Sequence, residues 1–431
     1  MNSQPTKSLL QTSLIVGFAL FAMFFGAGNI IFPPYIGVVS GGSWFLGFIA
    51  YFFADIGLAL LAILALLRSN TIDRFEGLMA RLGYWPSRFL MLGVMFSIGF
   101  IAGPRTATVS FELGLKPIMG ESANLAVYSG LYFFIAWLLT VKESKMVDYI
   151  GKYLTPTLVG GLIIMIVIGI VNPIGEVSPA AQIDNVWYMG LMSGYQTLDA
   201  VAALAFAFVI SQDLANKGYA TPESKFKAVV ASSLVVGVLM FIVYGGLCYL
   251  GATASMTYGA NVEHGSLVVT LFQALIGQSG AIVLGIIVTL ACLTTGMALM
   301  GAPATFLVRL SNGRLKYNVL VTMLAFAYAI IANIGLSNIL AIAVPVILIL
   351  YPAVLVMVVL SLFDSSIKNA NIFKISVGFA LIFSVLEVMK SQGVEAAGII
   401  EVLPLQEHGF GWILPAALGA VIGFFVKPAA E

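Results

Sequence analysis

Residues 9–39 read LLQTSLIVGFALFAMFFGAGNIIFPPYIGVV and contain no charged side chain. The stretch is longer than the ~20 apolar residues that one helix needs to cross the hydrocarbon core of a bilayer. Its centre, Phe25-Gly26-Ala27-Gly28-Asn29, combines two glycines with a polar amide. Such residues favour an unwound segment, and because lipid cannot satisfy free backbone groups, that segment must line a cavity. The stretch predicts a membrane helix broken at mid-depth, with a glycine-rich packing face as the alternative.

The composition of the whole chain is that of a membrane protein. Of its 431 residues, 60% are hydrophobic and 9% are charged, whereas a soluble domain has about 45–50% apolar and about 25% charged residues. So few charges cannot cover a surface in water, and most of the surface must therefore face lipid. We predict an all-α integral membrane protein whose largest partner is the lipid bilayer.

The same composition argues against several classes of function. The net charge of +1 offers no basic surface for nucleic acid. Cys248 and Cys292 lie in apolar runs, and His264 and His408 are far apart in the sequence, so neither a disulfide framework nor a Cys/His metal site is expected. The chain has no phosphate-binding GxxxxGK[ST] loop. We therefore expect no organic cofactor and no required ATPase subunit.

Charge-free stretches and the polar residues between them predict about twelve membrane helices. The proposed spans are 9–39, 43–67, 87–111, 124–141, 153–172, 187–212, 226–256, 279–308, 317–335, 338–363, 372–389 and 409–427. A short helix over 263–278 would lie against the outer mouth. With a cytoplasmic N-terminus, all of the 20 Lys and Arg except Lys116, Lys390 and Arg105 lie on the cytoplasmic side. This asymmetry supports that orientation, with both termini cytoplasmic.

The sixth span repeats the anomaly of the first. Its segment Gly194-Tyr195-Gln196-Thr197-Leu198-Asp199 places polar and helix-weakening residues near mid-depth. If 9–172 and 187–363 are two five-helix repeats, spans one and six begin them from opposite sides, as an inverted repeat requires. Paired interruptions of this kind indicate the central site of a secondary transporter. Residues 1–8 would form a cytoplasmic tail, and 372–427 two additional membrane helices.

The eighth span carries adjacent hydroxyls at Thr294 and Thr295, one turn after Ala291. Hydroxyl and carbonyl oxygens are ligands that suit a hard cation. The plain alternative is that each hydroxyl bonds to a carbonyl of the preceding helical turn.

The segment LFAMFFGAGNIIFPP, residues 20–34, resembles the signature of bacterial branched-chain amino acid:cation symporters, the BrnQ-type system II carriers. Gly103-Pro104-Arg105-Thr106 in the third span and the twelve-span layout are also similar to that family. The resemblance covers essentially the whole chain. It implies a LeuT-like fold with broken helices 1 and 6, two extra C-terminal helices, and a place in the bacterial inner membrane.

The resemblance also implies site residues. In the LeuT-like fold, the amides matching Ala27 and Gly28 bind the substrate carboxylate, and the residue matching Asn29 helps at a cation or substrate position. The sixth-span match is looser, so its individual roles stay open. The implied substrate-binding set is Gly26, Ala27, Gly28, Asn29, Gly194, Tyr195, Gln196, Thr197 and Asp199. The implied sodium ligands are the carbonyls of Ala22, Phe25 and Ala291 and the hydroxyls of Thr294 and Thr295.

Three ionisable residues lie within spans: Asp55, Arg105 and Asp199. Because a charge facing lipid is costly, each should face the protein interior and find a partner. Asp199 would hold the ammonium group of the substrate or a coupling proton. The structural alternative, which we favour for Asp55 and Arg105, is that an ion pair of Arg105 with Asp55 or Asp199 holds helices together.

The resemblance leads us to expect a secondary symporter that imports leucine, isoleucine and valine by alternating access. Thr294 and Thr295 favour sodium as the coupling ion, with protons second. Transport of other small neutral amino acids on the same fold is the nearest alternative. A channel would need a continuous polar stripe, and an intramembrane enzyme would need a catalytic pair at depth. We expect neither, and the sequence leaves the oligomeric state open.

Overall fold

The computed structural model describes residues 8–74, 76–394 and 400–427, and the secondary structure of these residues is entirely helical. Nearly all of the predicted tail, residues 1–7, lies outside them. The helices are α1 (Leu9–Phe24), α2 (Ala27–Ser40), α3 (Trp44–Phe52), α4 (Leu58–Arg68), α5 (Tyr84–Phe96), α6 (Gly103–Ser110), α7 (Lys116–Met119), α8 (Leu125–Thr140), α9 (Glu143–Tyr149), α10 (Thr155–Val171), α11 (Val186–Tyr195), α12 (Asp199–Asn216), α13 (Pro222–Ala252), α14 (His264–Ile276), α15 (Ser279–Leu310), α16 (Tyr317–Ala332), α17 (Leu336–Leu362), α18 (Ala370–Ser391) and α19 (Ile413–Phe425).

Helix occupies each stretch that the sequence predicts to span the membrane. Among the described residues, 8 helical stretches are long and apolar enough to cross a bilayer, and five further apolar helices have 10–17 residues. Several adjoining helices are joined by wider π-helical turns, for example at Phe53–Gly57 and Ser97–Ala102. The number of crossings and the division into two inverted repeats stay predictions.

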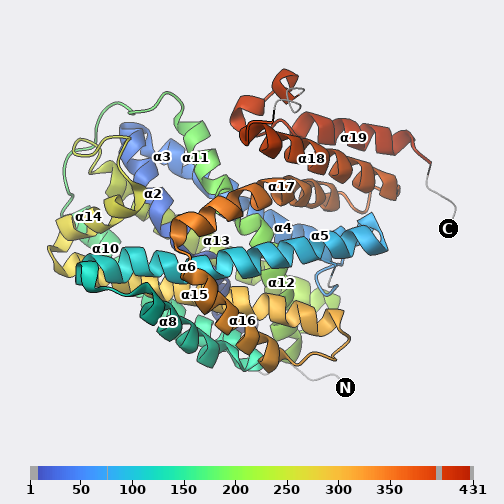
Figure 1. Cartoon of the computed structure of the whole chain (residues 1–431), viewed down its shortest axis with the longest axis horizontal. Coiled ribbons are helices and arrows are strands. Elements are labelled where there is room, and N and C mark those ends of the chain that lie inside the picture. Colours follow the sequence, from blue (N-terminus) through green and yellow to red (C-terminus); the bar gives the residue numbers. More distant parts are fainter. Residues whose placement is uncertain (1–7, 75, 395–399, 428–431) are drawn as a thin grey trace.

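Two pairs of helices are interrupted, α1–α2 and α11–α12, and α2 and α11 lie close together beside α3 (Figure 1). Helix α13 packs along both α1 and α2, α11 packs on α3, and α12 packs on α4. Helix α15 runs past α1, α6, α8 and α14, and so borders the interruptions from another side. The C-terminal pair α18–α19 packs on α17 at the edge of the molecule (Figure 1). The predicted short outer helix is α14, which lies against α2 and α15.

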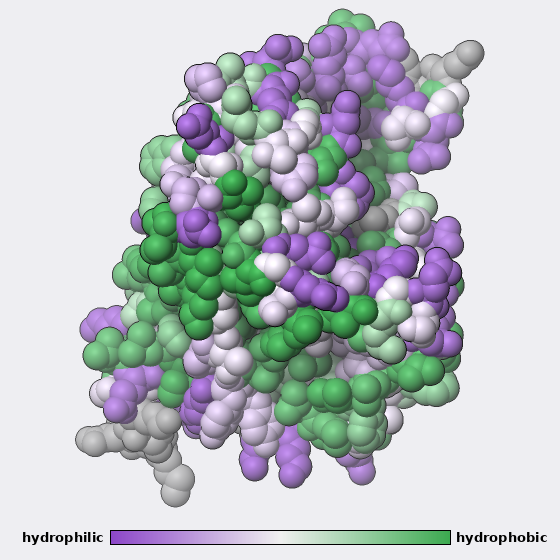
Figure 2. Space-filling view, turned by 90° about the vertical axis from the view of Figure 1, so that its left-hand side faces the viewer, coloured by the Kyte–Doolittle hydropathy of each residue, from purple (hydrophilic) through white to green (hydrophobic). Residues whose placement is uncertain are grey.

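Much of the surface is hydrophobic, as a membrane protein requires. Large green areas are visible in the view from the end that carries α14, interspersed with hydrophilic residues (Figure 2). Phe89 is 71% exposed and Phe326 is 71% exposed, while Val171 at the end of α10 is 80% exposed. Exposed aromatic and aliphatic side chains on this scale mark a surface that lies in lipid.

The end of α15 remote from α14 is closed by charged residues. The ammonium of Lys225 at the start of α13 lies 2.7 and 2.8 Å from the carboxylate oxygens of Asp73, and Ser211 of α12 donates to the same carboxylate at 2.6 Å. Burial opposes ionisation of Asp73, but Lys225 and Ser211 outweigh it and hold its pKa below the usual value. Lys217 also reaches Asp148 at 2.9 Å. These contacts tie the α4–α5, α9 and α12–α13 segments together.

Glycines allow α2 and α13 to touch through their backbones. A methyl group built on Gly37 would lie 1.9 Å from the Cys248 carbonyl oxygen, and one on Gly251 would lie 1.9 Å from the Pro34 carbonyl oxygen. Both distances are far below van der Waals contact, and the obstructing atoms are backbone. Close approach through small residues is the principal way in which membrane helices associate. The α2–α13 contact therefore depends on glycine from both sides.

We predict that Gly37→Ala destabilises the folded protein, at a cost on the order of 1–3 kcal/mol, because α2 and α13 must separate to admit the methyl group. The melting temperature of the purified protein in detergent should fall. Gly378→Ala on α18 is the matched control, since no heavy atom lies within 4 Å of its added methyl group. Equal melting temperatures for the two variants would contradict the predicted overlap.

Candidate functional site

The two helix interruptions lie at the predicted positions. Helix α1 ends at Phe24, and the backbone turns out of the helix at Phe25 (φ −70°, ψ 81°) before α2 begins at Ala27. Helix α11 ends at Tyr195 and α12 begins at Asp199. Between them, Leu198 has φ +67°, a left-handed conformation that costs energy for a residue with a side chain. Both interruptions are therefore specific breaks in the backbone.

Asn29 joins the two breaks. Its side-chain oxygen accepts from the Gly26 amide at 3.0 Å, so it satisfies a backbone group that the first break leaves free. Its side-chain nitrogen donates toward the Asp55 and Asp199 carboxylates, at 3.1 and 3.3 Å, and toward the Tyr244 hydroxyl at 2.6 Å. One amide thus connects α2, α12, α13 and the turn between α3 and α4.

Asp55 and Asp199 form a buried pair of carboxyl groups. Asp55 lies in the π-helical turn Phe53–Gly57 and is 1% exposed, and Asp199 opens α12 and is 6% exposed. Thr197 donates to Asp55 at 2.6 Å and can also donate to the Gly194 carbonyl at 2.6 Å, which ties the second break to the same turn. The Asn29 side-chain nitrogen donates toward both carboxyl groups, which places the two side by side.

A cavity of about 80 Å³ lies beside this network, and we call it the central cavity. At roughly 10–15 Å³ for each water, it has room for a ligand of several non-hydrogen atoms. Gly26, Gly28, Asn29, Arg105, Thr197 and Asp199 line its polar side. Phe24, Ile98, Val201, Phe206, Leu299 and Ile347 line its apolar side. The cavity thus combines charged groups with a hydrophobic wall.

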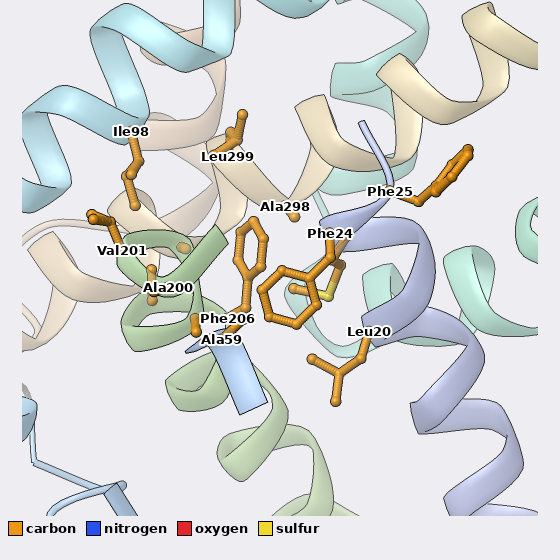
Figure 3. Close-up of a cluster of buried hydrophobic side chains, with 14 of the residues drawn as sticks. Leu20, Phe24, Phe25, Ala59, Ile98, Ala200, Val201, Phe206, Ala298 and Leu299 are labelled. Carbon is orange, nitrogen blue, oxygen red and sulfur yellow. The ribbon is translucent and has the colours of Figure 1, made fainter. Parts of the chain in front are cut away.

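The apolar wall comes from segments that are far apart in the sequence. The rings of Phe24 of α1 and Phe206 of α12 lie next to each other, with centroids 5.3 Å apart (Figure 3), and Ile98, Val201 and Leu299 line the same cavity. Phe25 points away from this group and stacks on Phe21, with centroids 5.0 Å apart (Figure 3). The first break thus directs consecutive phenylalanines to different sides.

A larger cavity of about 410 Å³ adjoins the first toward α14, and we call it the α14 cavity. Ala27, Gly28, Arg105, Leu198 and Ile347 line both cavities. The α14 cavity also touches Glu263 and His264 at the start of α14. The central cavity is therefore reached from the end of the molecule that carries α14.

The residues expected to bind sodium also converge. The Thr294 hydroxyl lies 2.9 Å from the Ala22 carbonyl oxygen, across the interface between α15 and α1, and the Thr295 hydroxyl lies 3.2 Å from the same oxygen. The Thr294 hydroxyl also lies 2.9 Å from the Ala291 carbonyl oxygen and 3.0 Å from the Leu290 carbonyl oxygen. The alternative, a hydrogen bond to the preceding turn of the same helix, is therefore present too. The first break also lies next to Thr295: a methyl group built on Gly26 would be 3.4 Å from the Thr295 hydroxyl oxygen.

This set of oxygens fits a monovalent cation. Two hydroxyls and two carbonyls gather at one point, and none of them carries a charge. Phe25 supplies the backbone next to them, while its side chain packs on Phe21 and Tyr244. Hard cations prefer such oxygen ligands.

Three predicted substrate residues, Gly194, Tyr195 and Gln196, do not line the central cavity. The Tyr195 ring packs on Tyr351 and Phe410, with centroids 4.3 and 5.4 Å away, and Gln196 lines the α14 cavity. The other predicted residues of the breaks, Gly194 included, touch either the central cavity or the carboxyl network. The sequence interpretation treated residues 194–199 as one unit, but Tyr195 is buried against Tyr351 and Phe410 and lines the α14 cavity.

The structure adds Tyr244 and the apolar wall to the site, and sequence reasoning missed both. Tyr244 is fully buried in α13 and contacts Asn29, and Phe206 is 1% exposed. A hydroxyl in the middle of a long apolar helix was a possible signal for Tyr244. Nothing in the sequence distinguishes Phe206 from the many other phenylalanines.

Comparison with known sequences gives matches over nearly the whole chain. The family model described as "Branched-chain amino acid transport protein" matches residues 10–430. The branched-chain amino acid permease BraB of Bacillus subtilis is 31% identical, over 100% of this chain and 98% of its own. The branched-chain amino acid transport system 2 carrier protein of Pseudomonas aeruginosa is 32% identical, over 95% of this chain and 94% of its own.

Solved structures show the same fold at low sequence identity. A Na⁺-coupled sialic acid symporter has a TM-score of 0.63 and 14% identity, covering 100% of this chain and 92% of its own. Mhp1, a nucleobase-cation-symport-1 family transporter, has a TM-score of 0.60 and 12% identity, over 95% and 91% of the two chains. MhsT in complex with L-phenylalanine has a TM-score of 0.55 and 16% identity, over 95% and 97%. The chain therefore has the LeuT-like fold, as predicted.

Proposed function

Because this chain belongs to the branched-chain amino acid transport protein family, we propose that it is a secondary symporter that imports leucine, isoleucine and valine. Its relatives are named as permeases and carrier proteins, so it is a multi-pass membrane transporter rather than an enzyme. The observation that carries the proposal is the central cavity, because it lies where both helix breaks meet and has one charged and one apolar side.

An aliphatic amino acid is complementary to this cavity. We assign its ammonium group to Asp199, the carboxyl group that lines the cavity beside Asn29. The amides of Ala27 and Gly28 begin α2, and a helix N-terminus attracts a carboxylate. The branched side chain then lies between Phe24, Phe206 and their neighbours. Ligand pockets commonly combine such an apolar lining with a few placed polar groups.

We propose alternating access between the two ends of the molecule. The central cavity joins the α14 cavity, while the opposite end is held by the Asp73–Lys225 and Asp148–Lys217 ion pairs. We propose that this arrangement faces the cell exterior and that release to the cytoplasm requires these ion pairs to separate. Rocking of one helix group around a fixed site is the usual motion of such folds.

Sodium is the coupling ion that we propose first. The carbonyls of Ala22, Phe25 and Ala291 and the hydroxyls of Thr294 and Thr295 would hold it next to the first break. A bound cation there would add positive charge beside α1 and α15 and favour the arrangement in which α1 and α15 are in contact. Only a ligand that binds one arrangement better than the other can shift their balance.

Proton coupling is the second candidate, and the Asp55–Asp199 contact favours it. We propose that these two carboxyl groups, which share the Asn29 side-chain nitrogen as a donor, hold one proton between them. Release of that proton would change the charge beside the substrate ammonium. The shared proton and a sodium ion would occupy different parts of the protein, which makes the two candidates separable.

Uptake of labelled leucine into proteoliposomes tests the proposed function. We expect accumulation above the outside concentration under an inward sodium gradient, with competition by isoleucine and valine. Accumulation under a proton gradient alone would assign the coupling to the carboxyl pair instead. Empty liposomes and a dissipated gradient are the controls. Folded protein that accumulates leucine under neither gradient would refute the proposed substrate.

The double variant Thr294→Ala with Thr295→Ala should raise the sodium concentration for half-maximal uptake by about tenfold or more, since two hydroxyl ligands are lost. The ratio of leucine to valine uptake should stay unchanged. Thr289→Ala is the matched control, because Thr289 lies on the same helix but meets Ser110 and Tyr128. Unchanged sodium activation in the double variant would remove this site from the mechanism.

Replacements of Gly28 test whether this glycine leaves room for the substrate or only allows helices to pack. A methyl group on Gly28 would lie 3.5 Å from the Phe32 ring and 3.8 Å from the Thr197 methyl carbon, which are ordinary contacts. We therefore expect Gly28→Ala to bind leucine nearly as well as the unmodified protein. Gly28→Leu should lose about 10- to 100-fold in affinity, because its side chain must enter the cavity. Leucine affinity retained in Gly28→Leu would show that the break serves helix packing alone.

A further inference from the structure

Arg105 is a cation inside the protein for which the described part of the chain provides no direct partner. It lies on α6, and its side chain lines both the central cavity and the α14 cavity. Within residues 8–74, 76–394 and 400–427, no hydrogen bond and no ion pair within 4 Å engages its guanidinium group. The sequence alternative, in which Arg105 pairs with Asp55 or Asp199 to hold helices together, therefore lacks the ion pair that it requires.

A guanidinium group stays charged in a protein and carries five N–H donors. Leaving such a charge unpaired inside a membrane protein is costly, so intramembrane cations line cavities and mark the paths of ligands. Arg105 follows Pro104 at the start of α6, and π-helical turns lie on both sides of that helix, at Ser97–Ala102 and Phe111–Leu115. π-helical turns of this kind occur frequently at functional sites.

The central cavity has two poles of opposite charge. Arg105 lies at the positive pole and Asp199 at the negative pole, and both line the cavity. They attract each other electrostatically, yet no ion pair within 4 Å joins their described side chains. Asn29 holds Asp199 on its own side at 3.3 Å. The space between the two poles suits a zwitterion, because its carboxylate could pair with Arg105 while its ammonium group pairs with Asp199.

Arg105 also lies where a carboxylate would meet the first break. Ala27 and Gly28, which begin α2, line the same two cavities as Arg105. A carboxylate at this junction can accept from the helix N-terminus and from the guanidinium together. The apolar wall around Phe24 and Phe206 lies on the central cavity alone, which leaves the junction for the charged end of the ligand.

We infer that Arg105 binds the α-carboxylate of the transported amino acid, with its ammonium group at Asp199, and that this pairing selects zwitterions over amines and alcohols. The inference rests on the proposed function, and it deepens it by assigning the carboxylate a charged partner. Arginine suits this role because its planar fork can donate two parallel hydrogen bonds to a carboxylate.

Binding of leucine and of leucinol, which has no carboxylate, tests the assignment. We expect the unmodified protein to bind leucine at least about tenfold more tightly than leucinol. Arg105→Gln should lose at least about tenfold in leucine affinity and change little toward leucinol, so that the preference collapses. The preference of Arg105→Lys for leucine should lie between those of the unmodified protein and Arg105→Gln, since lysine keeps the charge but lacks the planar fork. Affinities can be measured by ligand-induced thermal stabilisation of purified protein.

Arg314→Gln is the matched control, because Arg314 is exposed in the connection between α15 and α16. It should retain the full preference for leucine. Equal losses for leucine and leucinol in Arg105→Gln, or none, would show that Arg105 serves structure and would overturn the inference alone. If Arg105→Gln does not fold, an unchanged preference in Arg105→Lys would overturn it equally. Absence of leucine binding by the unmodified protein would instead refute the proposed function, and the inference with it.

Discussion

Lipid offers no hydrogen-bond partner to a free backbone group, and this constraint organises the centre of the protein. Each helix break releases amides and carbonyls that must find partners inside the chain. Asn29 satisfies the Gly26 amide, Thr294 and Thr295 satisfy the Ala22 carbonyl, and Thr197 approaches the Gly194 carbonyl. The polar side chains that make the breaks tolerable in a membrane are thus the same ones that surround the cavity.

Asn29 makes four of the hydrogen bonds in this arrangement. It contacts groups from the second break, from the α3–α4 turn and from α13, so a shift of either break changes its hydrogen bonds. Its two carboxyl neighbours have no basic residue in direct contact within the described chain. Their charge is therefore balanced by a proton, by more distant Arg105 and by whatever enters the cavity. The occupancy of the cavity and the hydrogen-bond pattern of both breaks are coupled for that reason.

The sequence was sufficient for the fold and for part of the site. Glycine and polar residues at mid-depth located both breaks, because breaks in a helix depend on local sequence. The hydroxyls of Thr294 and Thr295 do meet the Ala22 carbonyl, while their role as sodium ligands stays a prediction. The packing of Tyr195 against Tyr351, the contact of Tyr244 with Asn29 and the lack of a partner for Arg105 among the described residues depend on how distant helices rotate against one another. Helix rotation is set by packing contacts such as those of Gly37 and Gly251, and one sequence contains no direct record of which glycine meets which helix.

The backbone contact between α2 and α13 limits how the protein can move. Two helices that interlock at Gly37 and Gly251 have no room to slide past each other, so they must turn as one solid piece. Any change in the angle of α2 then has to be absorbed at Phe25 and Gly26, where the helical hydrogen bonds are already interrupted. Because α13 also packs along α1, bending at the first break would shift the α1–α13 contact while the α2–α13 contact stays intact.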